Sequence, residues 1–185
     1  MREFGEHDRV GVRVSARVER GATLVEALAF LAVAATITFG VLSLFGSGFG
    51  SSEATRLTVE VTALANDVRD LYASQNTYAS VSVAGLVQGN AVPPTLVVNG
   101  SGGSATLQDI WGGAVTVGPY NTTDAQVQYA NVPADICRRV LVAGGGNWLD
   151  IIVDGKDLNT GAPNLAAANG ACSEATGNTI EWVFQ

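Results

Sequence analysis

Gly21-Ala22-Thr23-Leu24-Val25-Glu26 opens the most apolar stretch of this 185-residue sequence, and no charged residue follows Glu26 until Glu53. From Ala22 to Phe45 the residues are almost all Ala, Leu, Val, Ile and Phe. About 20 apolar residues are enough for a helix to cross the hydrocarbon core of a bilayer. We therefore expect a membrane-spanning helix over 22–45, with the carboxylate of Glu26 near its start.

The leader before this stretch differs from the rest of the chain in charge. It holds five of the ten basic residues, four of the seventeen acidic residues and the only histidine, His7. The residues after Gly21 therefore carry five basic and thirteen acidic side chains, a balance that disfavours binding to nucleic acid. Without a histidine beyond the leader, the remaining sequence disfavours a catalytic triad or a histidine metal site, and no cofactor is expected. Asp150, Asp154 and Asp157 are close enough in sequence to suggest calcium, but their spacing does not match an EF-hand loop, so solvated turn acids are favoured and no metal is expected.

The leader is not typical of a secretory signal peptide. Such a peptide has an apolar core of roughly 7–15 residues and is cut after that core. Here the apolar run is longer, and the best small-residue site, Gly21, precedes it. The basic residues ahead of the span favour a cytoplasmic leader, although its acidic residues weaken that bias. An ordinary signal anchor is the alternative interpretation.

The segment from Gly21 to Glu26, with the apolar run behind it, resembles the class III signal of type IV prepilins. The resemblance implies that a prepilin peptidase cuts after Gly21 on the cytoplasmic face and methylates the new amino terminus at Ala22. Glu26 is then the fifth residue of the mature chain, where this family carries Glu. A leader of 21 residues, and a first mature residue other than Phe, are more similar to the type IVb branch than to type IVa.

Glu26 also has a physical reason to take part in subunit assembly. A carboxylate in an apolar bundle is costly unless a positive group pairs with it. The resemblance implies that the α-amino group of Ala22 on a neighbouring subunit supplies this charge and registers incoming subunits. The alternative is a carboxylate that only reaches out to the membrane interface.

Glycine and serine interrupt the apolar run over 46–52. Because Gly costs about 1 kcal/mol relative to Ala inside a helix, we expect a helix break here, with a plain linker as the alternative. Over 53–75 apolar residues recur at steps of three and four, which predicts an amphipathic helix lying on a sheet. Its apolar positions are Leu57, Val61, Leu64, Val68, Leu71 and Tyr72.

After Ser74 short β-prone runs alternate with turn residues. The predicted strands are Thr95–Val98, Gly113–Val117, Ala125–Ala130, Leu149–Val153 and Thr179–Phe184, and short helices are expected at Ser80–Val87 and 133–143. Trp111, Trp148 and Trp182 are interpreted as residues that pack on the sheet.

Four segments of this region resemble the major-pilin family of thin type IVb pili, which includes conjugative and colonisation pili. They are Leu71-Tyr72-Ala73-Ser74-Gln75-Asn76-Thr77-Tyr78, Trp111-Gly112-Gly113-Ala114-Val115-Thr116-Val117, Asn131-Val132-Pro133 with Cys137, and Cys172 before Gly177-Asn178-Thr179. The resemblance covers nearly the whole chain. It implies a pilin-like α+β fold, in which a long N-terminal helix packs on an antiparallel sheet and a cysteine pair brackets a C-terminal region.

Cys137 and Cys172 are the only cysteines. If the region that follows the apolar run is exported, we expect them to form a disulfide. Closing a loop of this length could add about 4 kcal/mol in the chain-entropy model. Two buried thiols in a cytosolic protein are the alternative.

Together these features favour a structural protein over an enzyme. The expected parts are the removed leader 1–21, a membrane and filament-core helix 22–45, the break 46–52, and a periplasmic or extracellular domain 53–185. The resemblance implies a type IV major pilin that is held in the inner membrane and polymerised by the inner-membrane assembly machinery into an extracellular helical homopolymer for adhesion, aggregation or conjugation. A minor pilin or secretion pseudopilin is one alternative, and a singly anchored surface binding domain is another.

Overall fold

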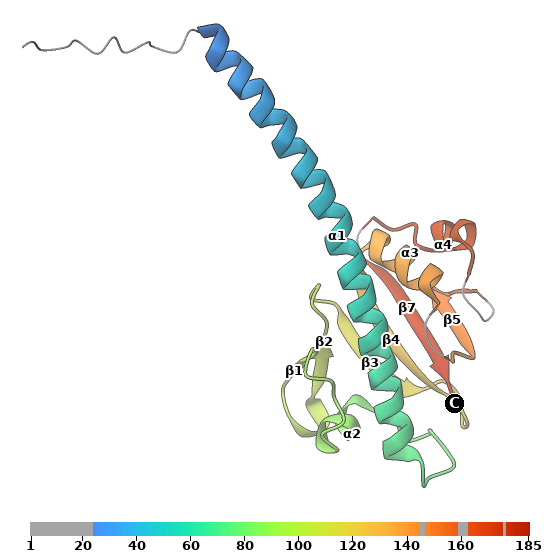
Figure 1. Cartoon of the computed structure of the whole chain (residues 1–185). Coiled ribbons are helices and arrows are strands. Elements are labelled where there is room, and N and C mark those ends of the chain that lie inside the picture. Colours follow the sequence, from blue (N-terminus) through green and yellow to red (C-terminus); the bar gives the residue numbers. More distant parts are fainter. Residues whose placement is uncertain (1–23, 145–146, 159–162, 176) are drawn as a thin grey trace, which may run out of the picture. The chain divides into compact units, whose positions relative to one another are not determined.

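The computed structural model describes residues 24–144, 147–158, 163–175 and 177–185, with the backbone alone over 42–49. The chain divides into two compact units, Met1–Ser43 and Leu44–Gln185. Helix α1, Leu24–Tyr72, begins in the first unit and ends in the second (Figure 1). The described part of the first unit is the apolar segment of this helix, and the sheet and the other helices belong to the second.

A single antiparallel sheet forms the frame of the second unit. Within the described residues it has seven strands in the order β1-β2-β3-β4-β7-β5-β6. The strands are β1 Val97–Asn99, β2 Thr106–Gln108, β3 Ala114–Pro119, β4 Ala125–Val132, β5 Asp150–Val153, β6 Lys156–Asp157 and β7 Asn178–Phe184. The helices beside α1 are α2 Val83–Gln88, α3 Ala134–Ala143, α4 Leu165–Ala171 and the 3₁₀ turn η1 Gly102–Ser104.

The amphipathic part of α1 lies across one face of this sheet (Figure 1). The buried side of the helix repeats every three or four residues, as a helical stripe must. Its buried residues are Ala54, Leu57, Val61, Leu64, Ala65, Val68 and Tyr72. On the sheet, alternate residues of β4 and β7 meet this stripe, and the rings of Tyr129 and Trp182 pack edge to face at 5.8 Å. Each large apolar side chain buried in this way contributes roughly 1.5–3 kcal/mol.

The opposite face of the central strands is polar. Thr116, Gln128 and Glu181 lie side by side on β3, β4 and β7. Thr116 Oγ1 bonds to Gln128 Oε1 at 3.0 Å, and Gln128 Nε2 donates to Glu181 Oε1 at 2.8 Å. Such a ladder is typical of a strand face that contacts water, and it accounts for the alternation of apolar and polar residues along β4.

The predicted α+β architecture is confirmed, since each predicted strand and short helix forms with ends displaced by a few residues. Trp182 is buried in the core and Trp111 and Trp148 pack against it, as predicted. The sequence analysis missed β2, β6 and α4. Two of these are strands of three and two residues, too short for an alternating pattern to appear, and α4 is a seven-residue helix rich in Ala.

The predicted helix break at 46–52 differs from the structure, in which the backbone of α1 is helical throughout that range. Ending and restarting a helix leaves several backbone groups without partners, and this outweighs the cost of isolated glycines. Gly50 also has a packing role, because a Cβ there would lie 3.2 Å from Asp135 Oδ2 and 3.4 Å from Arg139 Nε. A glycine at this position therefore lets α3 approach α1 closely.

Candidate functional site

The N-terminal site residues are only partly described by the structure. Gly21 and Ala22 lie outside the described residues, whereas Glu26 lies in the first turn of α1. A carboxylate is favourably placed there, because the N-terminus of a helix carries a partial positive charge.

The helical segment Leu24–Val41 is long and apolar enough to cross a membrane, and none of it is buried within the structure. Its exposed large side chains are Leu24, Val25, Leu28, Phe30, Leu31, Val33, Ile37, Phe39 and Val41. The hydroxyls of Thr36 and Thr38 each donate at 2.8 Å to a carbonyl oxygen of the preceding turn. The hydroxyl donors are therefore satisfied within the helix, as an apolar environment requires.

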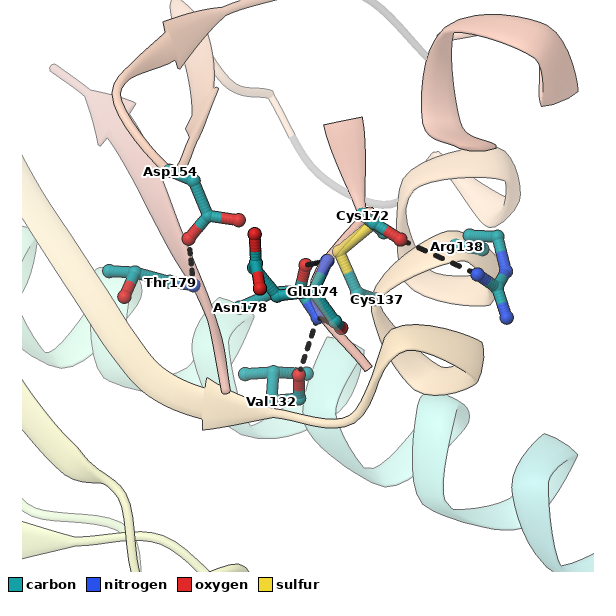
Figure 2. Close-up of a disulfide and its surroundings, with 8 residues drawn as sticks. All are labelled: Val132, Cys137, Arg138, Asp154, Cys172, Glu174, Asn178 and Thr179. Carbon is teal, nitrogen blue, oxygen red and sulfur yellow. Dashed lines mark hydrogen bonds between the residues drawn. A yellow bond between two sulfur atoms is a disulfide. The ribbon is translucent and has the colours of Figure 1, made fainter. Parts of the chain in front are cut away.

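In the second unit, Cys137 on α3 and Cys172 just after α4 form a disulfide, with their Cα atoms 5.9 Å apart (Figure 2). The predicted pairing is confirmed. The bridge closes a loop that contains β5, β6 and α4, and both cysteines are buried in the core. Two short strands and a short helix have little burial of their own, so this cross-link substitutes for part of a core.

Polar contacts fix the chain that leaves the disulfide (Figure 2). Asn178 is fully buried, and its Nδ2 donates to the carbonyl oxygens of Val132 at 3.1 Å and Glu174 at 2.7 Å. Arg138 Nη1 donates to Cys172 O at 3.4 Å. Asn178 therefore joins the end of the disulfide-bounded region to β4, and its amide is satisfied without water.

Replacing both cysteines by serine is expected to lower the free energy of unfolding by about 2–4 kcal/mol, because the unfolded chain regains the freedom that the bridge removes. Urea unfolding of the detergent-solubilised chain, followed by Trp fluorescence, measures this loss. A double alanine variant is the matched control, since it removes the bridge without burying two hydroxyls. An unchanged unfolding midpoint in both variants would contradict a stabilising role for the bridge.

Two buried carboxylates lie where α1 crosses the sheet. Glu60 on α1 is 6% exposed and Asp109, in the turn after β2, is 4% exposed. Glu60 Oε1 accepts a hydrogen bond from Tyr129 Oη at 3.1 Å. Asp109 Oδ1 accepts from the amides of Trp111 at 2.9 Å and Gly113 at 2.7 Å, whereas Asp109 Oδ2 is buried without a partner among the described residues.

Burial raises the pKa of two side chains in this cluster, Asp109 and Tyr129. Burial raises the pKa of Asp109, and the nearby Glu60 raises it further, against the lowering effect of the backbone amides. Burial, then the charge and hydrogen bond of Glu60, raise the pKa of Tyr129, which keeps its phenol a donor. The cluster therefore joins α1 to the sheet through a buried hydrogen bond. We interpret it as a structural contact. The sequence analysis did not predict it, because the three residues are far apart in the chain.

Asp109→Asn is expected to stabilise the domain by about 1 kcal/mol at pH 7, because it removes a charge that burial and the nearby Glu60 make unfavourable. The amide keeps the acceptor for Trp111 and Gly113. Because the folded pKa of Asp109 is raised, its favourable contribution is complete at acidic pH and is lost as pH rises through that pKa.

Urea unfolding midpoints measured from pH 4 to pH 8 test this expectation. The difference between Asp109→Asn and the wild type should grow as the pH rises. Asp109→Ala is the control that loses both backbone hydrogen bonds and should be less stable at every pH. A difference that shrinks toward high pH would contradict the assignment.

The outer side of α3 borders a surface groove of about 510 Å³, which we call the α3–α4 groove. It is lined by Asp135, Arg138, Arg139, Val142, Ala143, Leu165 and Asn169. A second depression of about 340 Å³ shares Arg139 and Ala143 with it and extends to α1 at Ser51 and Thr58. The sequence analysis expected α3 but not α4, so it had no signal for the groove.

Comparison with known proteins places this fold in a family. The family model described as PilS N terminal matches residues 51–185, which is the second unit almost entirely. This chain belongs to the PilS N-terminal family. The match begins at residue 51, so the PilS N-terminal region includes the amphipathic part of α1, the sheet and the disulfide, and the apolar segment lies ahead of it.

Two curated relatives agree with the PilS N-terminal assignment. Both are the major structural subunit of bundle-forming pilus, from Escherichia coli O127:H6 and from Escherichia coli O111:H-. Each is 28% identical over 109 residues, covering 59% of this chain and 55% of the relative. The chain thus spans about half the length of the curated relatives it matches.

A solved structure shows the same fold. The type IV b pilin from Salmonella typhi superposes with a TM-score of 0.55 at 24% sequence identity, covering 68% of this chain and 95% of that one. The fold of this PilS N-terminal domain is therefore that of a type IVb pilin, as the resemblance implied.

Proposed function

We propose that this chain is the major structural subunit of a type IV pilus. The observation that carries the proposal is the combination of a PilS N-terminal, pilin-fold domain over 51–185 with an exposed apolar helix ahead of it. An apolar helix that none of the described residues covers needs lipid or other apolar helices around it. A membrane before assembly and a bundle of identical helices after assembly supply these two environments in turn.

The proposal includes a processing step. A prepilin peptidase cuts after Gly21, the inner membrane holds the apolar helix over 22–45, and the assembly machinery adds subunits to an extracellular filament. The α-amino group of Ala22 on one subunit pairs with Glu26 on its neighbour. The position of Glu26 in the first turn of α1 supports this pairing, because the carboxylate lies at the start of an apolar helix, where a charge is costly unless it is paired.

Intact mass and N-terminal sequencing of protein sheared from the cell surface test the proposed function. The expected chain begins at Ala22, is two hydrogens lighter for the disulfide, and is about 14 Da heavier if Ala22 carries a methyl group. A chain that begins at Met1 and occurs only in the membrane fraction would favour a singly anchored surface domain. A processed chain that is a trace component of the sheared filaments would favour a minor pilin or pseudopilin.

Glu26→Ala is expected to leave the subunit processed but to lower the amount of filament by about tenfold or more. Removing one member of a pair in an apolar environment leaves the other charge uncompensated, which costs about 3–5 kcal/mol. Electron microscopy and immunoblots of sheared and membrane fractions measure filament and subunit separately. Glu53→Ala, on the same helix, is the matched control and should assemble normally. Abundant normal filaments from Glu26→Ala would remove Glu26 from the mechanism.

A further inference from the structure

The α3–α4 groove combines positive charge with apolar surface. Of the five basic side chains that follow the leader, Arg138 and Arg139 both line it, with Val142 and Leu165 exposed beside them. The hydrogen bonds of the two guanidiniums go to neutral oxygens, from Arg138 to a backbone carbonyl and from Arg139 to the Ser51 hydroxyl. Asp135 lowers the charge of the groove to +1, which remains unusual in a region of net charge −8.

The carboxyl end of α1 has the opposite character. Asp67, Asp70 and Leu71 lie at positions i, i+3 and i+4, so they share one face of the helix. Asp70 and Leu71 are exposed, and burial together with the charge of Asp70 raises the pKa of Asp67. Two carboxylates near a helix C-terminus oppose the helix dipole and repel each other. This arrangement costs stability in a single subunit.

The hydrogen bonds of Arg69 go to groups other than Asp67 and Asp70. Its Nε donates to Gln185 O at 2.7 Å, its Nη1 donates to Asn66 Oδ1 at 3.0 Å, and its guanidinium lies 4.8 Å from the Phe184 ring. The basic side chain of this turn is therefore directed to the end of β7 and to the helix itself.

Helices α3 and α4, whose residues line the groove, and the carboxyl end of α1 lie at opposite ends of the second unit (Figure 1). α3 packs on α1 at Gly50 and Ser51, whereas Asp70 lies 19 residues after Ser51 on the same helix, about 28 Å at 1.5 Å per residue. The two surfaces cannot meet within one molecule. A contact between them on two copies would be heterologous, and such a contact extends into a helical filament unless the rotation closes it into a ring.

We propose that the α3–α4 groove of one copy receives the carboxyl end of α1 of the next copy, with Asp67 and Asp70 beside Arg138 and Arg139 and Leu71 against Val142 and Leu165. This inference rests on the proposed function, because it names a contact of the filament. The occupant is a second copy, because each copy carries both complementary surfaces and the two surfaces of one copy are too far apart to contact each other. The pairing also places positive groups beside Asp67 and Asp70, for which the described part of the subunit shows no ion pair.

Charge reversal in the full-length chain, expressed in its native host, tests the contact. Arg138→Glu with Arg139→Glu, and Asp67→Lys with Asp70→Lys, are each expected to lower surface filament by about tenfold or more, because like charges then face each other. The quadruple variant restores opposite charges and should recover most of the filament. Lys156→Glu and Glu174→Lys are matched reversals outside the two surfaces, and both should assemble as the wild type does.

The amount of processed, disulfide-bonded subunit in the membrane is measured in every strain. If the Arg138 and Arg139 double variant lowers the amount of subunit, the test uses the single changes Arg139→Glu and Asp70→Arg and their combination. Both side chains are exposed, so these changes should not disturb folding. Normal filaments from either reversal, or no recovery in the restored variant at normal subunit levels, would overturn the inference. A wild-type strain without filaments would instead overturn the proposed function.

Discussion

Gly21→Ala is expected to leave the full 185-residue chain in the membrane, with no filament at the cell surface. The expectation follows from the proposed cut after Gly21, where a larger side chain blocks processing. The effect is all or none for a physical reason, because an uncut chain has no α-amino group at Ala22. Its leader also carries five arginines, which cannot enter a bundle of apolar helices without pairing.

Intact mass of the membrane-bound protein measures this result directly. The variant should show the mass of the chain from Met1, whereas the wild type should show the mass of the chain from Ala22. Gly11→Ala is the matched control, since it makes the same change in the leader away from the proposed site. Mature protein of normal size from Gly21→Ala would remove Gly21 from the processing mechanism.

Gly113→Ala is expected to cost about 3 kcal/mol or more, or to prevent the domain from folding. A Cβ at Gly113 would lie 1.8 Å from the carbonyl oxygen of Ala130 and 2.9 Å from Asp109 Oδ2. The first of these atoms belongs to the backbone of a central strand, so it cannot yield as a flexible side chain would. Relief requires β3 and β4 to separate, which disrupts the pairing of Val115 with Tyr129.

Gly118→Ala is the control for this experiment, because Gly118 lies on β3, the strand that Gly113 precedes, and a Cβ there meets nothing within 4 Å. Its stability should stay within about 0.5 kcal/mol of the wild type. Urea unfolding in detergent measures the stability of both variants, and the amount of subunit in cells shows whether each one folds. Equal unfolding midpoints for Gly113→Ala and the wild type would show that the two strands move apart at little cost.

Much of the fold could be predicted because its elements are marked locally. The helical stripe from Leu57 to Tyr72 and the alternating residues of β4 each carry a period that the sequence displays. The disulfide followed from there being only two cysteines, once export was assumed. Glu26 and the cut site followed from a local motif, and they stay predictions because Gly21 and Ala22 lie outside the described residues.

The rest depends on contacts between distant residues, which no local pattern records. Gly113 reads as the first residue of a predicted strand, and its close approach to another backbone becomes visible only when β4 is placed beside it. Glu60 and Asp109 read as surface acids until α1 covers them, and Arg138 and Arg139 read as a solvated helix face until α4 forms the other wall of the groove. The helix over 46–52 shows a related limit, since the propensity of individual glycines is weaker than the cooperativity of the helix around them.

The place of β7 in the sheet has a consequence for the order of folding. The last strand in sequence lies between β4 and β5, so it supplies the partners for one edge of each. Until its residues are present, β4 exposes an unpaired edge and the disulfide-bounded region has no strand on which to dock. The sheet therefore closes only when the residues of β7 are available, and its closure depends on contacts that are distant in sequence. A chain truncated before β7 is expected to leave β4 and β5 without their shared partner, so it cannot complete this domain.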